Sequence, residues 1–182
     1  MSGERRAAEP SIRIAGEEDR LAIARVHIRS WQVAYRGLID DDFLDALRPE
    51  DRAGIYPIGP AAATMPRTIV AEEDGEIVGF ATMVPSRDED APGFGEISAL
   101  YVDPDRWRGG VGRRLLEESR RHMREAGFEE GLLWVLVGNE PAERFYEEDG
   151  WRHDGATRTE DPYGPEVEVR RFRRRLAAPH AP

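Results

Sequence analysis

The sequence predicts an α/β domain: a mixed central sheet of about six or seven strands, flanked by helices, with one parallel crossover. Two strand-like runs, Thr68–Glu72 and Glu76–Val84, are separated by Glu73-Asp74-Gly75 and should pair as an antiparallel hairpin. A strand-like run from Glu96 to Val102 then leads through a glycine-rich turn into a helical stretch. The uninterrupted apolar run Leu132–Val137 follows and is typical of a central strand covered on both faces. A strand, a helix and a strand in this order indicate a right-handed parallel crossover.

Length and composition are those of one globular domain. The chain has 182 residues, of which 40% are hydrophobic and 34% charged. We expect a single domain over residues 11–176, preceded by a flexible segment over 1–10 and followed by a flexible tail over 177–182. There is no cysteine, which excludes disulfides, thiolate metal sites and a cysteine nucleophile.

Charge and hydropathy narrow the function classes. The net charge is −10 and all 26 basic residues are arginine, so the chain is poorly suited to binding nucleic acid and its field favours cationic substrates. No run approaches the roughly 18 apolar residues of a membrane span, and the N-terminus lacks an apolar signal region, so we expect no membrane contact and a cytoplasmic protein. The four histidines are scattered without ligand spacing, so no metal site is predicted. The oligomeric state stays open, a homodimer included.

The N-terminal third predicts a short strand and two helices. Ser11–Ile14 alternates as a strand does, and a polar cluster then leads into a helix that we expect to end at Gly37. The apolar face of this helix comprises Leu21, Ala24, Ile28, Trp31 and Tyr35. A second short helix is expected around Phe43, Leu44 and Leu47, before a loop over 57–66.

The remaining helices and strands are predicted from the positions of glycine and proline and from the periodicity of the apolar residues. The polar, glycine-containing segment 85–95 predicts a mobile surface loop. The helix after the glycine-rich turn is amphipathic and ends at Gly127. Pro141 suits the first turn of another helix, which should end at Gly150. Trp151 and the run Val167–Arg173 should supply the last strands.

The glycine-rich turn has the character of a phosphate-binding site. It reads Trp107-Arg108-Gly109-Gly110-Val111-Gly112 and opens directly into a helix, whose first N–H groups lack partners and whose dipole favours an anion. Glycines permit close approach of the backbone, and Arg108, Arg113 and Arg114 add cationic donors. An ordinary tight turn before a surface helix is the alternative interpretation.

A second segment, Asn139-Glu140-Pro141-Ala142-Glu143-Arg144-Phe145-Tyr146, stands about 30 residues further on. Together the two segments resemble the GNAT superfamily of acyl-CoA-dependent N-acyltransferases. In that family a turn of the form Gln/Arg-x-x-Gly-x-Gly/Ala holds the CoA pyrophosphate, and an Asn-x-x-Ala-x-x-Phe-Tyr segment meets the pantetheine and the sulfur. The resemblance covers residues 96–151 clearly and implies a GNAT-like mixed sheet whose two strands beside the crossover helix splay apart.

The resemblance implies acetyl-CoA, or another acyl-CoA, as co-substrate and no metal. The best frame places Trp107 at the Gln/Arg position, with Gly110 and Gly112 at the small-residue positions. This departure at Trp107 leaves the backbone cradle intact but does not imply a contact between the indole and the cofactor. The implied cofactor-binding residues are Tyr101, Val102, Arg108, Gly109, Gly110, Val111, Gly112, Arg113, Asn139 and Phe145.

Two residues are candidates for catalysis. Tyr146 matches the family's tyrosine acid: a phenol with a pKa near 10 is protonated at neutral pH and can donate to the departing thiolate. Alternatively it is a core aromatic. Glu96 opens the strand that the resemblance places beside the acyl group, where in this family a carboxylate sometimes activates the amine through water. Alternatively it is a solvated glutamate at a strand end.

The other candidates also keep two interpretations. Asn139 either contacts pantetheine or caps the following helix, and these roles are compatible. Trp31, Tyr35 and Trp134 either line an acceptor pocket or belong to the core.

We therefore predict an N-acyltransferase that moves an acetyl or other short acyl group from acyl-CoA directly to a primary amine. The amine, whether a small molecule or part of a protein, is not specified by the sequence. A non-catalytic acyl-CoA sensor or interaction module of the same fold is the alternative, and Tyr146 argues against it. A nucleotide-binding domain is disfavoured because neither Gly-x-x-x-x-Gly-Lys-Ser/Thr nor Gly-x-Gly-x-x-Gly is present.

Overall fold

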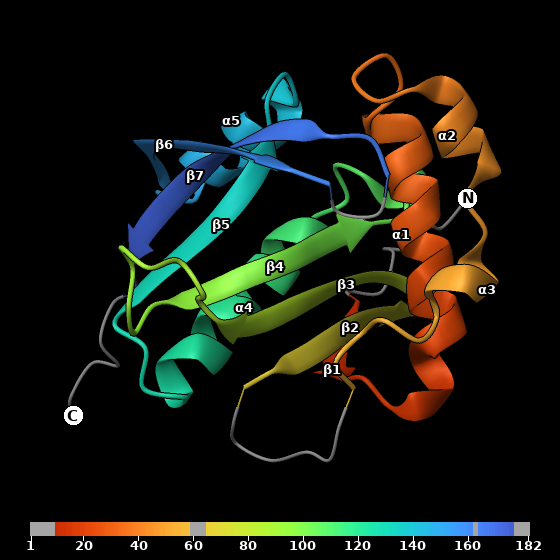
Figure 1. Cartoon of the computed structure of the whole chain (residues 1–182). Helices are drawn as coiled ribbons and strands as arrows, with labels where there is room; N and C mark the ends of the chain where they lie inside the picture. Colours follow the sequence, from red (N-terminus) through yellow and green to blue (C-terminus); the bar gives the residue numbers. More distant parts are fainter. Residues whose placement is uncertain (1–9, 59–64, 162–163, 177–182) are drawn as a thin grey trace, which may run out of the picture.

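A single mixed sheet organises the chain. The computed structural model describes residues 10–58, 65–161 and 164–176, which form seven strands in the order β1-β2-β3-β4-β5-β7-β6 (Figure 1). The predicted mixed sheet is confirmed, with all neighbouring strands antiparallel except β4 and β5. The predicted tail over 177–182 and nearly all of the predicted N-terminal segment lie outside the described residues.

The element bounds are as follows. The strands are β1 Ser11–Ile14, β2 Arg67–Glu73, β3 Glu76–Pro85, β4 Gly95–Val102, β5 Glu130–Leu136, β6 Arg152–Glu160 and β7 Val167–Arg175. The α-helices are α1 Arg20–Ala34, α2 Asp41–Ala46, α3 Pro49–Arg52, α4 Val111–Glu125 and α5 Glu140–Glu148.

The β2–β3 hairpin forms as the sequence predicts. Its two turn residues, Asp74 and Gly75, both have positive φ, 51° and 81°. Two successive positive values are the requirement of the turn that matches the twist of a hairpin, and Asp-Gly satisfies it well. The turn therefore sets the register, with Glu73 opposite Glu76.

The parallel pair β4–β5 is short, and this opens the sheet. Pairing runs only from Gly95–Gly131 to Ile97–Leu133, although both strands continue. A bulge falls at Ser98, since Ile97 and Ala99 face consecutive residues of β3. The predicted splay of the strands beside the crossover helix is thus confirmed, and it leaves the later half of β4 unpaired with β5.

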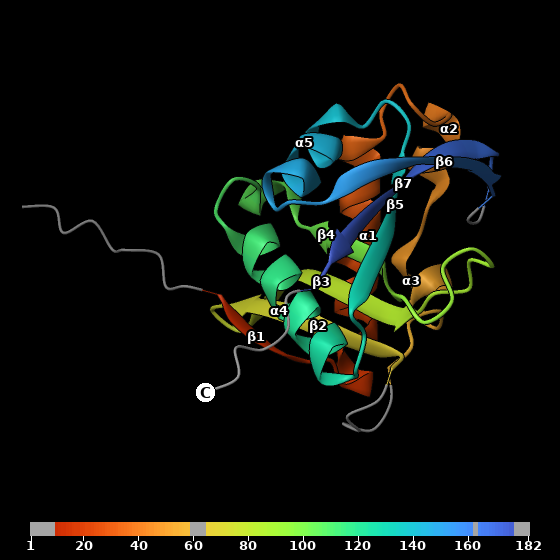
Figure 2. The same cartoon turned by 90° about the vertical axis from the view of Figure 1, so that its left-hand side faces the viewer.

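Helices cover both faces of the sheet (Figure 2). Phe80 of β3 packs in a cluster with Ile23 and Ala24 of α1, whereas the next residue, Ala81, packs in a cluster with Leu115 of α4. Successive side chains of a strand point to opposite faces, so α1 and α4 lie on opposite sides. The glycine-rich turn before α4 and the N-terminal helix α1 therefore lie on opposite faces of the sheet beside the short β4–β5 pairing.

Some boundaries and elements differ from expectation. Helix α1 ends at Ala34 and is capped by Tyr35, with Gly37 (φ 78°) in the turn that follows. Helix α3 is a single turn with no periodicity to detect. Strand β6 consists of nine mostly exposed residues at the sheet edge, so it lacks the apolar alternation that predicts strands. Trp151, expected in a strand, is fully buried immediately before β6.

The loop between β3 and β4, which the sequence predicted to be mobile, is held to the sheet by ion pairs. The guanidinium of Arg171, 5% exposed, donates to Asp88 (3.0 Å) and Asp90 (2.6 Å) of the loop and to Asp154 (2.8 Å) of β6. The partners Arg171 and Asp88 lie 83 residues apart in the chain, so no local pattern could indicate the contact.

Candidate active site

The end of β4 is held by two side chains. The carbonyl oxygen of Val102 accepts hydrogen bonds from Ser30 Oγ of α1 (2.7 Å) and from Trp107 Nε1 (2.8 Å). The indole that departs from the family pattern therefore fixes the turn to the strand, while its ring remains 43% exposed. Trp107 acts on the cradle through the backbone of Val102.

The turn that follows has the backbone of an anion site. Arg108 (φ 64°) and Gly110 (φ 87°) are left-handed, and Gly110 caps α4. The first backbone hydrogen bond of α4 is donated by the amide of Arg114 to the carbonyl oxygen of Gly110 at 3.1 Å. The amides of Val111, Gly112 and Arg113 come before this bond, at the helix start where N–H groups have no partner within the helix.

Cationic side chains surround these amides. Arg108 and Arg113 are exposed, and neither makes an ion pair or hydrogen bond with another residue in the described part of the chain. Both guanidiniums are therefore free to meet phosphate oxygens. The donor set of the turn fits the pyrophosphate of a coenzyme A thioester.

The second predicted segment meets the turn in space. A Cβ atom built on Gly112 would lie 3.4 Å from Cζ of Phe145 in α5 and 3.6 Å from Cγ2 of Val102. Asn139 caps α5, its Oδ1 accepting from the amide of Ala142 at 3.4 Å. The capping role of Asn139 is thus present, and its side-chain amide donors have no partner among the described residues.

Tyr146 lies one residue after Phe145 and is buried. Its ring packs in the main core, with its centroid 5.1 Å from the centroid of the Phe145 ring and 6.5 Å from that of the Trp151 ring. Burial, and secondarily the phenol of Tyr101, raises the pKa of Tyr146 above its usual value of 10. The hydroxyl therefore stays protonated at neutral pH, and it has no hydrogen-bond partner among the described residues. Both sequence interpretations of Tyr146 are compatible: its ring packs, and its hydroxyl can donate.

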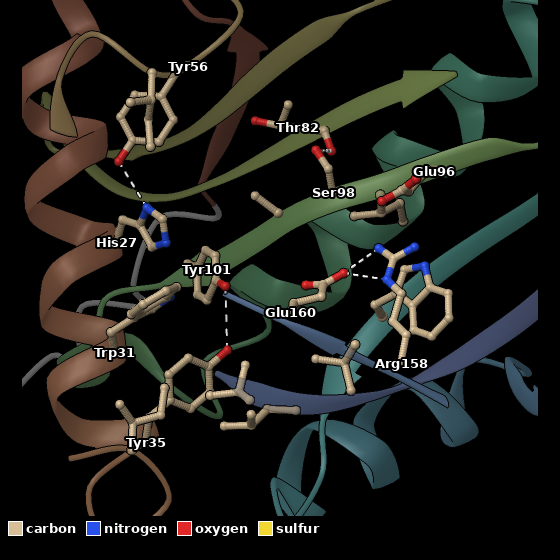
Figure 3. Close-up of a pocket in the computed structure, with 18 of the residues that line it drawn as sticks. His27, Trp31, Tyr35, Tyr56, Thr82, Glu96, Ser98, Tyr101, Arg158 and Glu160 are labelled. Carbon is tan, nitrogen blue, oxygen red and sulfur yellow. Dashed lines mark hydrogen bonds and ion pairs between the residues drawn. The ribbon is translucent and has the colours of Figure 1, made fainter. Parts of the chain in front are cut away.

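A pocket of about 270 Å³ lies on the α1 side of the opening (Figure 3). Glu96 and the three predicted acceptor residues Trp31, Tyr35 and Trp134 all line it, together with Tyr101. The ring of Tyr101, which the resemblance implied to meet the cofactor, is stacked on His27 with centroids 4.5 Å apart, within this pocket. The hydroxyls of Tyr35 and Tyr101 are 3.4 Å apart.

Tyr146 lies near the tyrosines of the pocket but does not itself line the pocket. The phenol of Tyr146 interacts electrostatically with those of Tyr101 and Tyr35, which line the pocket. Tyr146 itself belongs to the core on the α4 side. An acyl group held between β4 and β5 would therefore have the pocket on one side and Tyr146 on the other.

Glu96 is the pocket carboxyl whose pKa lies near neutrality. Burial, and then the nearby Asp88 and Glu160, raise the pKa of its carboxyl against the opposing charges of Arg158 and Arg87, and the net result is a pKa of about 7. It has no ion pair or hydrogen bond with another described residue. A carboxyl with a pKa near neutrality and no partner is suited to accept a proton from a substrate.

Several pocket residues were not anticipated. Arg158 stacks on Trp134 with its guanidinium carbon 3.9 Å from the ring centroid, and it donates to Glu160 (2.6 Å) and Asp88 (2.7 Å). Both Arg158 and Glu160 belong to β6, the edge strand without an apolar pattern, so the sequence held no signal for them.

His27 is the other pocket residue that sequence reasoning set aside. It is 5% exposed, with Nδ1 2.9 Å from the Tyr56 hydroxyl. Burial, and then the charge of Arg52, lowers the pKa of His27 to about 3, so the imidazole is neutral. In the sequence, only its position four residues before Trp31, on the same face of the helix, indicates that His27 is buried.

No group of three or more His, Cys, Asp or Glu side chains in the described part of the chain is arranged to hold a metal ion. No helix among the described residues has the length and apolar character needed to cross a membrane.

Known proteins resemble this chain in sequence and in fold. A family model described as "Acetyltransferase (GNAT) family" matches residues 26–151. The uncharacterized N-acetyltransferase YuaI of Bacillus subtilis (strain 168) is 31% identical over 137 residues, which cover 75% of this chain and 77% of that protein.

Two solved structures show the same fold. The PaiA N-acetyltransferase from Thermoplasma acidophilum, in complex with coenzyme A, has a TM-score of 0.70 at 20% identity and covers 91% of this chain and 98% of that one. YncA of Salmonella typhimurium, described as a putative acetyltransferase with its cofactor acetyl-CoA, has a TM-score of 0.67 at 21% identity and covers 96% and 98%.

Proposed function

Because the chain belongs to the acetyltransferase (GNAT) family and is thus an enzyme that uses acetyl-CoA, we propose that it transfers the acetyl group directly to a primary amine in the aromatic pocket. The observation that carries this proposal is the placement of Glu96, with a pKa of about 7, in a pocket beside the short β4–β5 pairing, while Tyr146 lies near Tyr35 and Tyr101 of the same pocket. A base and an acid on opposite sides of one opening suit acyl transfer to an amine.

Residues for holding the co-substrate are present. The amides at the start of α4, with Arg108 and Arg113, would hold the pyrophosphate, and Val102, Asn139 and Phe145 would contact the pantetheine arm. Acetyl-CoA supplies the acetyl group as a thioester, whose carbonyl carbon the amine attacks and whose sulfur leaves. Val111, Gly109 and Gly112 complete the backbone of the cradle.

Glu96 and Tyr146 handle the protons. An ammonium entering the pocket loses a proton to the Glu96 carboxylate, directly or through water, and becomes nucleophilic. The amide groups of β4 beyond Ile97 that face the opening are available to stabilise the carbonyl oxygen, because β5 does not pair with them. The Tyr146 hydroxyl gives its proton to the sulfur as the C–S bond breaks, and it regains one, through solvent, from the nitrogen as the amide forms. The products are the N-acetyl amide, the free thiol and one proton.

A turnover assay tests the proposal. Thiol release from acetyl-CoA should depend on an added primary amine and should yield its N-acetyl derivative, identified by mass. Tertiary amines of similar size should give none. Tight acetyl-CoA binding without turnover across a broad amine panel would instead support the acyl-CoA sensor, which membership of an acetyltransferase family disfavours.

The cradle predicts a large effect at Gly110. Gly110→Asp should weaken acetyl-CoA binding at least about tenfold, since a carboxylate would face the pyrophosphate at the helix start. A Cβ built there has no atom within 4 Å, so no clash is expected, although any side chain is strained at this positive φ. Gly110→Asn, equal in size and tolerant of positive φ, is the matched control and should bind more tightly than the Asp variant. Calorimetry measures both, and equal affinities in the two folded variants would exclude the cradle.

Asp88 should tune the pH dependence. It raises the pKa of Glu96, so Asp88→Asn should lower that pKa and move the acid limb of the kcat profile to lower pH. Asparagine keeps an acceptor for Arg158 and Arg171, which limits structural change. An unshifted limb in the folded variant would show that the titrating group lies elsewhere.

A further inference from the structure

One side of the acceptor pocket is an aromatic wall. Trp31 of α1 and Tyr35, which caps that helix, have ring centroids 5.3 Å apart, and the ring centroid of Tyr101 of β4 lies 6.5 Å from that of Trp31. Such a wall buries the apolar body of a ligand. The guanidinium carbon of Arg52 already lies 5.0 Å from the Trp31 ring centroid, so the wall offers apolar contact and the carboxylates of the pocket attract the cation.

The hydroxyl groups of the pocket are already engaged with the protein. Thr82 Oγ1 lies 3.0 Å from Thr68 Oγ1, and Ser98 Oγ donates to the Thr82 carbonyl at 3.4 Å. The Tyr56 hydroxyl bonds to His27, and those of Tyr35 and Tyr101 meet each other. These hydroxyls keep acceptor lone pairs, but several of their O–H donors are already used within the protein, so a polyhydroxylated acceptor would find few free donors in the pocket.

The charges of the pocket exclude anions. Glu96 and Glu160 both line it, and Figure 3 shows the Glu160 carboxylate between Tyr101 and Arg158. Among the described lining residues, Arg158 is the one permanent cation, and Glu160 and the nearly buried Asp88 already hold it. A carboxylate on the acceptor would face two like charges and would compete with two carboxylates for that guanidinium. An ammonium group on the acceptor would instead be attracted by the carboxylates of Glu96 and Glu160.

The pocket is also small. Its volume of about 270 Å³ lies just below the usual range of small-molecule sites, about 300–1,000 Å³. A compact molecule fills it.

We propose that the acceptor is a compact primary amine that is cationic in solution, has an aromatic or aliphatic body and carries no carboxylate or phosphate. This inference rests on the proposed function and narrows its substrate class. Glu160, held against Arg158, is the residue that excludes anionic amines, whereas Glu96 takes the proton.

Matched pairs of amines test it on the unaltered protein. 2-Phenylethylamine and phenylalanine differ by a carboxylate next to the amine, and hexylamine and 6-aminohexanoate differ by a remote one. In each pair we expect kcat/KM with acetyl-CoA to be at least about tenfold higher for the amine without the carboxylate. Calorimetry without acetyl-CoA should show tighter binding of the same member.

A variant assigns the discrimination to Glu160. Glu160→Gln removes one carboxylate and leaves Arg158 held by Asp88 alone, so kcat/KM for phenylalanine relative to 2-phenylethylamine should rise about tenfold, with acetyl-CoA affinity unchanged. Glu168→Gln, on the exposed side of β7 and away from the pocket lining, is the matched control and should keep the wild-type ratio.

The outcomes separate this inference from the proposed function. Acetylation of both members at equal rates, or preferential acetylation of the carboxylates or of amino sugars, would overturn the inference and leave amine acetylation intact. An unchanged ratio in Glu160→Gln would overturn the role of Glu160. Absence of thiol release with every amine, despite acetyl-CoA binding, would overturn both.

Discussion

Replacing Tyr146 with phenylalanine should lower kcat about 100-fold or more while acetyl-CoA affinity changes little. The ring is part of the core beside Phe145 and Trp151, so the variant keeps nearly all the buried surface and loses only the hydroxyl. Because burial raises the pKa of this phenol, it donates as the neutral acid across the whole physiological pH range. The measurement is kcat with saturating amine, under conditions where chemistry limits turnover.

Tyr35→Phe provides the comparison for Tyr146. It also removes a hydroxyl, but one that faces Tyr101 in the acceptor pocket, so its main effect should be on the KM of the amine. A loss confined to KM in Tyr146→Phe would indicate a binding role for that tyrosine. Wild-type kcat would remove Tyr146 from the mechanism, and the thiolate would then leave unprotonated or take a proton from water.

Glu96→Gln should lower kcat about 100-fold at pH 8 and abolish the acid limb of its pH profile. In the unaltered enzyme the carboxyl, with a pKa of about 7, is the competent base only when deprotonated. The rate should therefore rise as pH increases through about 7 and then level. Glutamine keeps the size of the side chain but cannot accept the proton.

Glu168→Gln is the surface control for Glu96, and it should retain both the rate and the limb. Persistence of an acid limb near pH 7 in Glu96→Gln, with kcat little reduced, would assign the proton to another group or to a water relay. Measurement of kcat rather than kcat/KM keeps ionisation of the free amine out of the comparison.

Local patterns were sufficient for most of the fold. The Asp74-Gly75 turn, the apolar run in β5 and the glycines before α4 each act on their own backbone, so the hairpin, the central strand and the crossover could be predicted. The elements that the sequence did not predict are those without such a local pattern. Helix α3 is one turn long, and the edge strand β6 exposes most of its side chains.

The sequence by itself determined the family resemblance, the glycine-rich start of α4 and the identity of the candidate acid and base. Only the tertiary structure decided that Glu96, Trp31 and Trp134 line one pocket, because long-range strand pairing and the packing of α1 on the sheet bring them together. The tertiary structure alone also decided the environment of Glu96. A pKa depends on burial and on charges nearby in space, and Asp88, Arg158 and Glu160 come from a loop and an edge strand that carry no sequence signal of their meeting.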